Sequence, residues 1–149
     1  MEKPVIIRRA KEEDLSEVHR IEVLSFKYPY TYSYLKALYL LSPNLFYVAE
    51  VDGKVIGYVV GLIELGSIGH IISIAVHPGW RRKGIGSKLL KKIEDEFKRK
   101  GIKSFILEVE ITNKPAISLY KKHGYRVIDV IKGYYPGGED AYVMVKEDA

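Results

Sequence analysis

The chain has 149 residues, a formal net charge of +5 at pH 7 and no cysteine. This length is typical of one domain with its own hydrophobic core, so we expect a single domain over residues 1–149. The lack of cysteine excludes a disulfide scaffold, a Cys-ligated zinc site and a cysteine nucleophile. With 47% hydrophobic and 29% charged residues, the composition also excludes a disordered, collagen-like or coiled-coil chain.

The N-terminus and the apolar runs predict a cytoplasmic protein. The first residues, Met-Glu-Lys-Pro, lack the apolar core of a signal peptide. The longest nearly unbroken apolar run, Val55 to Ile63, is far shorter than the ~20 residues that cross a bilayer. Depletion of Gln and Asn with many Lys and Glu favours a thermophilic source. The basic balance indicates an anionic partner, either nucleic acid, a membrane surface or a phosphate-bearing ligand.

The first half of the chain predicts one short strand, two helices and a three-strand meander. Apolar residues at helical spacing mark the helices, and runs rich in Ile and Val mark the strands. Asp52-Gly53 predicts the tight turn of a hairpin. In chain order the expected elements are a strand at Val5–Arg8, helices at Glu12–Phe26 and Ser33–Leu41, and strands at Leu45–Val51, Lys54–Glu64 and His70–Val76.

The second half alternates helices and strands. The expected elements are a helix at Gly84–Lys100, a strand at Ser104–Ile111, a helix at Asn113–His123, and strands at Tyr125–Ile131 and Ala141–Val145. In the first of these helices the apolar stripe is Leu89, Leu90, Ile93 and Phe97, and the expected solvent face is Lys91, Lys92, Glu94, Asp95, Lys98 and Arg99. The element order indicates an α+β or mixed α/β sheet with helices on its faces.

The clearest local signal runs from Val76 to Ser87, where a strand ends, a loop carries cations and two glycines open a helix. The free N–H groups at a helix N-terminus bind phosphate. Gly84 and Gly86 let the backbone approach a bulky anion, and the three cations at 81–83 add charge. The spacing matches neither the dinucleotide fingerprint nor the P-loop. A tight turn with solvated cations is the alternative interpretation.

Two further segments strengthen this signal: the strand Gly69–Val76 and the stretch Asn113–Tyr125, which reads N-K-P-A-I-S-L-Y-K-K-H-G-Y. Together with R-x-x-G-x-G at Arg81–Gly86, they resemble the GNAT superfamily of acetyl-CoA-dependent N-acetyltransferases, from Val5 to Val145. The resemblance implies the GNAT fold, in which a mixed sheet of about seven strands is flanked by about four helices and splayed between its two middle strands.

The resemblance also implies where acetyl-CoA binds. It places the pyrophosphate on the amides of Arg82, Lys83, Gly84, Ile85, Gly86 and Ser87. It places the acetyl and pantetheine arm against the backbone of Ile74, Ala75 and Val76. Asn113 resembles the cofactor-contacting Asn of the family. Tyr120 resembles the tyrosine near the CoA sulfur, a candidate general acid for the leaving thiolate.

A narrower resemblance concerns the acceptor. The segments G-H-I-I-S-I-A-V and K-G-Y-Y-P-G-G-E-D-A-Y-V-M are similar to protein N-terminal acetyltransferases, chiefly archaeal single-chain relatives of the NatA catalytic subunit and more distantly ribosomal-protein alanine acetyltransferases. This implies a peptide site with Tyr134 and Tyr135 on one wall and Phe26 and Tyr28 on the other. Phe26 replaces a Glu of the NatA-type segment L-P-E-N-Y, so we expect an uncharged or hydrophobic first residue to be preferred.

The chemistry of acetyl transfer needs a neutral amine. A free α-amine has a pKa of about 7.7–8.0 and a lysine about 10.4, so far more of the α-amine is neutral at pH 7. The resemblance makes His70 and Glu108, on adjacent strands, the candidate bases, acting through water. The sequence does not choose between them. No His, Asp or Glu cluster has metal-ligand spacing, so we expect no metal site.

Two alternatives stay open: a lysine or small-amine acetyltransferase of the same fold, and a basic module that binds nucleic acid or CoA without catalysis. Glu94, Asp95 and Glu96 interrupt the cations of their helix, which disfavours nucleic acid. The joint presence of candidate acid and base residues disfavours a module without catalysis. We therefore expect protein or peptide N-termini as the substrate, the ribosome or an auxiliary subunit as further candidate partners, no membrane contact, and a monomer or weak homodimer.

Overall fold

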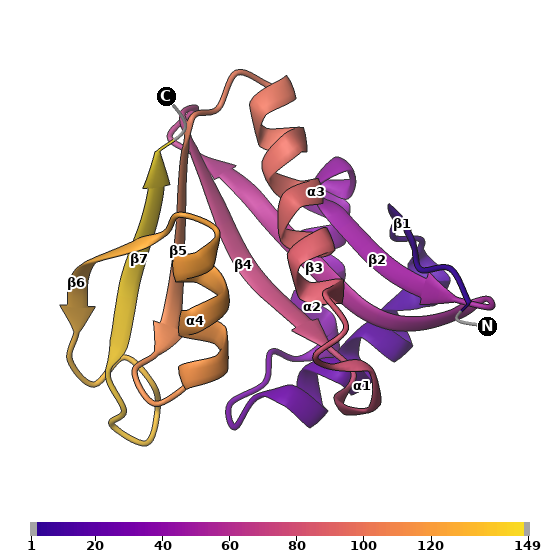
Figure 1. The fold of residues 1–149 in the computed structure, drawn as a ribbon, viewed down its shortest axis with the longest axis horizontal. Helices are drawn as coiled ribbons and strands as arrows, with labels where there is room; N and C mark the ends of the chain where they lie inside the picture. The colour runs from indigo at the N-terminus through magenta and orange to yellow at the C-terminus, as the bar shows by residue number, and fades with distance from the viewer. Residues whose placement is uncertain (1–2, 148–149) are drawn as a thin grey trace.

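The structure, a computed structural model, describes residues 3–147. Within this range seven strands form one sheet in the order β1-β2-β3-β4-β5-β7-β6, and four α-helices cover its faces (Figure 1). The strands are β1 (Ile6–Arg9), β2 (Phe46–Val51), β3 (Lys54–Glu64), β4 (Ile68–Val76), β5 (Ser104–Glu110), β6 (Arg126–Ile131) and β7 (Ala141–Glu147). The helices are α1 (Leu15–Ser25), α2 (Tyr32–Leu41), α3 (Ile85–Arg99) and α4 (Lys114–Lys122).

Every predicted helix and strand is present, and most ends lie within two residues of those expected. The largest shift is at the first helix, because Glu12–Asp14 forms a 3₁₀ turn and α1 begins only at Leu15. The second helix begins at Tyr32 because the side chain of Thr31 accepts a hydrogen bond from the backbone N–H of Tyr34 and so caps the helix. No helix among the described residues has the length and apolar composition that a bilayer span requires.

Each face of the sheet has its own hydrophobic core. Figure 1 shows α3 and α4 in front of the sheet and α1 and α2 behind it. The predicted stripe of α3 is fully buried in the front core. Behind the sheet, Leu15, Val18 and Ile21 of α1 pack with residues of β2 and β3. A cavity between the two middle strands, β4 and β5, is bordered by residues of α1 from one helical layer and of α4 from the other.

Two glycines allow α3 to lie directly on the sheet. A Cβ atom at Gly69 would stand 2.7 Å from the ring of Phe97, and one at Gly61 would stand 2.7 Å from Ile93 and 2.9 Å from the carbonyl oxygen of His70. These distances are shorter than any tolerable carbon contact, so only glycine fits. As a result, α3 packs closely against β3 and β4 on the front face of the sheet.

The expected solvent face of α3 is wrong at Glu94. This side chain is 3% exposed, and its carboxylate accepts hydrogen bonds from the Tyr125 hydroxyl (2.7 Å) and the Lys146 ammonium (2.9 Å). Glu96 is also buried, and it pairs with Arg99 at 2.8 Å. Both acids thus turn inward, and of the acids expected to interrupt the cations only Asp95 is exposed. The argument that acids interrupt the cations on the surface of this helix, which disfavoured nucleic acid, is therefore weaker than the sequence suggested.

The two middle strands diverge, as predicted. β4 and β5 are parallel neighbours, but only Ile68–His70 pairs with Ser104–Ile106. Both strands continue beyond the paired segment, β4 to Val76 and β5 to Glu110. The pairing of β4 with β3 shifts between Val60 and Gly61, which is the position of a β-bulge. The divergence opens a gap in the centre of the sheet.

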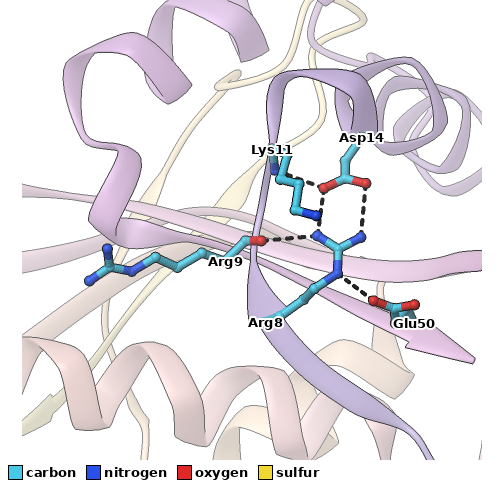
Figure 2. A network of polar contacts seen from close by, with 5 residues as sticks. All are labelled: Arg8, Arg9, Lys11, Asp14 and Glu50. Atoms are coloured by element: carbon cyan, nitrogen blue, oxygen red, sulfur yellow. Dashed lines mark hydrogen bonds and ion pairs between the residues drawn. The ribbon is translucent and has the colours of Figure 1, made fainter. Parts of the chain in front are cut away.

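A charged network ties β1 to the start of α1 (Figure 2). The Arg8 guanidinium donates hydrogen bonds to both oxygens of Asp14, at 2.8 and 3.0 Å, and also pairs with Glu50 of β2. The backbone N–H of Lys11 donates to Asp14 at 2.7 Å. Burial raises the pKa of Asp14, but the bonds from Arg8 and Lys11 outweigh it, so the pKa lies below its ordinary value of 3.8.

Replacing Asp14 with Asn should lower the free energy of unfolding at pH 7 by about 2 kcal/mol, between the values for exposed and fully buried ion pairs. Because the pKa is depressed in the folded state, the contribution of Asp14 is present above pH ~4 and is lost as the pH falls through the folded pKa. The two proteins should therefore converge in acid. Urea unfolding at pH 7 and pH 3 measures this, and a difference that is equal at both pH values contradicts it.

Candidate active site

A cavity of about 680 Å³ lies where β4 and β5 diverge. Its walls include residues 71–74 of β4, residues 107–110 of β5, the start of α4, the loop between α1 and α2, and the loop between β6 and β7. Volumes of this size are typical of sites for small ligands. The gap in the sheet is therefore the candidate active site.

The predicted cofactor strand borders this cavity. Ile74 lines it, whereas Ala75 and Val76 lie further along β4, outside its walls. Beyond His70 this strand has no β5 partner, so its edge is open to other hydrogen bonds. One such bond is already made, because the Arg81 guanidinium donates to the Val76 carbonyl at 2.9 Å and to the Ser25 hydroxyl at 3.1 Å. Arg81 thus fixes the turn that follows β4.

The predicted phosphate-binding turn has an uncommon backbone. Gly84 caps α3 with φ of 78°, and Arg82 also has a positive φ of 64°. Residues of left-handed conformation beside right-handed ones turn successive N–H groups toward one side, which makes an anion-binding concavity. Arg82 and Lys83 are exposed, and the first N–H groups of α3, on Ile85, Gly86 and Ser87, have no intrahelical partner. The turn lies outside the cavity walls.

Two of the predicted cofactor residues have partners of their own. The Ser87 hydroxyl lies 2.9 Å from His123 Nε2, which links α3 to α4. Burial lowers the pKa of His123, so the ring is neutral at pH 7. Asn113 lines the cavity and caps α4, because its side-chain oxygen accepts from the backbone N–H of Ala116 at 3.3 Å. The Ser87 side chain is therefore engaged, while its backbone N–H stays free for a phosphate.

The candidate base His70 lies between two carboxylates. Its Nε2 is 2.8 Å from Glu108 and its Nδ1 is 2.7 Å from Glu64. Burial alone would lower the pKa of His70, but the bonds to Glu108 and Glu64 raise it to about 9. At neutral pH the ring is therefore charged, and each nitrogen donates to one carboxylate. An imidazolium cannot accept a further proton.

Glu108 is the member of this trio that faces the cavity. Glu64 stands at the end of β3, and its side chain is 44% exposed. Sequence reasoning missed Glu64, because it is brought to His70 only by the β3–β4 pairing, in which His70 stands opposite Leu62, two residues away. The geometry therefore favours Glu108 over His70 as the candidate base.

Tyr120 of α4 also lines the cavity and is 7% exposed. Burial raises the pKa of Tyr120 well above its ordinary value, and the nearby Tyr135 acts in the same direction. The hydroxyl therefore keeps its proton at neutral pH and is available as a donor inside the cavity.

The four predicted aromatic residues line the cavity: Phe26 and Tyr28 from the α1–α2 loop, and Tyr134 and Tyr135 from the β6–β7 loop. Tyr30 of the first loop lines it too. The rings of Tyr28 and Tyr135 stack at 6.1 Å with an interplanar angle of 16°. Two loops that are far apart in the sequence thus meet across the opening. Rigid aromatic faces with polar tips suit the binding of an extended peptide.

Glu139, which sequence reasoning missed, joins the same two loops. Its carboxylate accepts from the Lys27 ammonium at 2.9 Å and from the Tyr28 hydroxyl at 3.1 Å. The Tyr28 hydroxyl also occupies the space that a Cβ atom at Gly137 would take, so a side chain at this position would displace Tyr28 from its place beside Glu139. No signal in the sequence pairs residues 27 and 139, because their contact depends on the positions of both loops.

These features fit the cofactor that the sequence resemblance implies. The open edge of β4 can bind an extended arm, and the turn before α3 offers free amides and two cations to a pyrophosphate. The cavity places a proton acceptor and a proton donor beside the same gap. Among residues 3–147, no group of three or more His, Asp or Glu side chains is arranged to hold a metal ion.

Comparison with known proteins agrees with this geometry. The model of the Acetyltransferase (GNAT) family matches residues 15–125. The chain is 42% identical over 144 residues to an uncharacterized N-acetyltransferase of Methanocaldococcus jannaschii (96% of this chain, 92% of the relative). It is 37% identical over 150 residues to an N-alpha-acetyltransferase of Sulfurisphaera tokodaii (93% and 90%).

The fold agrees equally well with a solved structure. The crystal structure of Ard1 from Thermoplasma volcanium superposes with a TM-score of 0.94 at 30% identity, covering 97% of this chain and 98% of that one. The chain therefore belongs to the GNAT family of acetyltransferases. It is an acetyltransferase that uses acetyl-CoA as the acyl donor.

The charge on His70 is directly measurable. Its NMR titration should have a midpoint of about 9, and Glu64→Gln should lower that midpoint toward the ordinary 6.5. Because the pKa is raised in the folded state, the contribution of His70 to stability is complete below pH 6.5 and is lost as the pH rises through about 9. His123 gives an internal reference, since it should titrate below 6.5. A His70 midpoint below 7 would overturn the assignment.

Proposed function

We propose that the protein transfers the acetyl group of acetyl-CoA to the α-amino group of protein or peptide N-termini. The observation that carries the proposal is the aromatic opening of the cavity, in which two loops meet above the gap that holds Glu108 and Tyr120. This shape suits the end of an extended chain. Support also comes from a relative of similar length that bears the name N-alpha-acetyltransferase.

The proposed proton movements use groups within the cavity. The α-ammonium of the peptide loses its proton to Glu108, through water, and the neutral amine attacks the thioester carbonyl. A C–N bond forms as the C–S bond breaks, and the leaving thiolate takes a proton from the Tyr120 hydroxyl. The acylated nitrogen then loses its extra proton, which returns through water to the Tyr120 oxygen. His70 acts as a charged partner that holds the Glu108 carboxylate in place. An α-amine needs less help than a lysine, because its pKa is lower by about 2.5.

A turnover assay with acetyl-CoA tests the acceptor. Peptides with free Met, Ala, Ser or Leu N-termini should release CoA thiol, whereas the same peptides with a blocked N-terminus and an internal lysine should not. Glu108→Gln should slow the reaction by about 10²- to 10⁴-fold, the usual contribution of a general base. Turnover on the blocked peptides alone would transfer the assignment to lysine acetylation. Turnover on neither, with CoA binding intact, would favour a small amine or a CoA-binding module.

The first side chain of the peptide should meet Phe26. This residue lines the cavity and is partly buried against the core behind the sheet. Phe26→Glu should lower kcat/KM for peptides that begin with Met or Leu by about tenfold, because a carboxylate replaces apolar contact area. A panel of first residues, run on both proteins, measures the change in preference. An unaltered ranking of the panel would contradict the role of Phe26.

A further inference from the structure

Among residues 3–147, Glu22 is the most deeply buried charged residue, with 1% exposure. It lies in the last part of α1, on the core face of that helix. One carboxylate oxygen accepts hydrogen bonds from the Tyr58 hydroxyl and from the Ser73 hydroxyl, the latter at 2.8 Å. The other oxygen accepts from the backbone N–H of Tyr30 at 3.0 Å.

A carboxylate at this depth is costly. Moving an ionised group out of water carries a penalty of several kcal/mol, and hydrogen bonds from protein groups offset it only when their geometry is good. The neighbouring core positions of the same helix, Val18 and Ile21, are apolar and fully buried. An apolar residue would therefore satisfy the packing of this face, and core packing alone does not account for an acid at position 22.

The three donors come from three different elements. Tyr58 lies on β3, and Ser73 lies on β4 one residue after the bulge, at the border of the cavity. Tyr30 lies on the α1–α2 loop, which also carries Phe26 and Tyr28. The Glu22 carboxylate thus connects the α1–α2 loop, which carries aromatic residues of the cavity wall, to β4. Its contact on β4 is Ser73, the residue just before the predicted cofactor segment.

We infer that Glu22 is a positioning residue, which holds the acceptor-binding loop at a fixed distance from the cofactor strand. The inference rests on the proposed function, since it assigns the loop to the acceptor peptide. Glu22 itself contacts no reacting atom in this role. Its effect is to hold the loop on which the peptide binds beside the gap between β4 and β5, so it acts on the binding of the acceptor.

The test is Glu22→Gln. The amide of Gln has the same shape, but it offers one acceptor in place of two and cannot satisfy both Ser73 and the N–H of Tyr30. The loop should loosen, so the KM for a free N-terminal peptide should rise about tenfold, while kcat and the KM for acetyl-CoA stay within about twofold. Steady-state kinetics with each substrate varied in turn measures the three constants.

Asp14→Asn is the matched control. Asp14 is also buried and also accepts from Arg8 and a backbone N–H, but it lies outside the cavity walls. The Asp14→Asn variant should have a lower melting temperature than the wild-type protein, but the same KM for the peptide and for acetyl-CoA. An unaltered peptide KM in Glu22→Gln, or an equal rise in Asp14→Asn, would refute the positioning role.

Hydrogen exchange on the wild-type protein gives a second measurement, which decides the question even where Glu22→Gln does not fold. The Tyr30 amide should exchange at least about tenfold more slowly than the neighbouring loop amides, because it is bonded to a buried carboxylate. Exchange as fast as that of its neighbours would overturn the inference. Wild-type activity confined to blocked lysine peptides would refute the proposed function instead, and the KM comparison would then be made with those peptides.

Discussion

The parallel pairing of β4 and β5 is the constraint on which the rest of the site depends. It holds for three residues on each strand and then ends, although both strands continue. A continuous sheet would satisfy the backbone of β4 with β5 and would leave no opening. Since the strands separate, the backbone edge of β4 is available to a ligand. On the other side of the gap, residues 107–110 of β5 line the cavity.

Paired carboxylates organise the surroundings of this gap. Glu108 and Glu64 hold His70 in its charged form at the last paired position of β4. Glu22 holds the strand and the α1–α2 loop on the other side of the bulge. Each acid is stabilised by donors from elements other than its own, as buried charges require. The polar groups near the gap are thus fixed before a substrate arrives, which favours catalysis.

The two loops at the opening add selectivity to this frame. Tyr28 stacks on Tyr135, and Glu139 pairs with Lys27 across the same contact. The charged pair is largely exposed, so it contributes little to stability. Its consequence is geometric, because it helps to narrow the approach to Glu108. Membership of the GNAT family explains the acetyl-CoA side of the molecule, whereas the choice of amine is the role that we propose for these loops.

The sequence by itself determined the order of the elements, the turn before α3 and the family, and the family resemblance in turn implied the divergent sheet. The elements, the turn and the family are recognised from local signals, namely helical spacing, glycines in turns and short motifs such as R-x-x-G-x-G. Each of these signals is formed by residues that are close together in the chain. About half of the predicted site residues, among them Glu108, Tyr120, Asn113 and the four predicted aromatic residues, line one cavity, whereas the predicted pyrophosphate residues lie outside it at the turn before α3.

Only the tertiary structure decided which side chains pair. Glu94 follows the polar pattern of α3 and yet is buried, since its partners lie on β7 and beside β6. Glu22 and Glu139 are similar cases, because each meets donors that are distant in the sequence. Glu64 meets His70 across the β3–β4 hairpin. That Glu108 lines the cavity while His70 lies between two carboxylates likewise depends on the register of β4 with β3 and β5. A periodic pattern shows which face of an element is polar, but the charge state of a residue depends on what the other elements place against it.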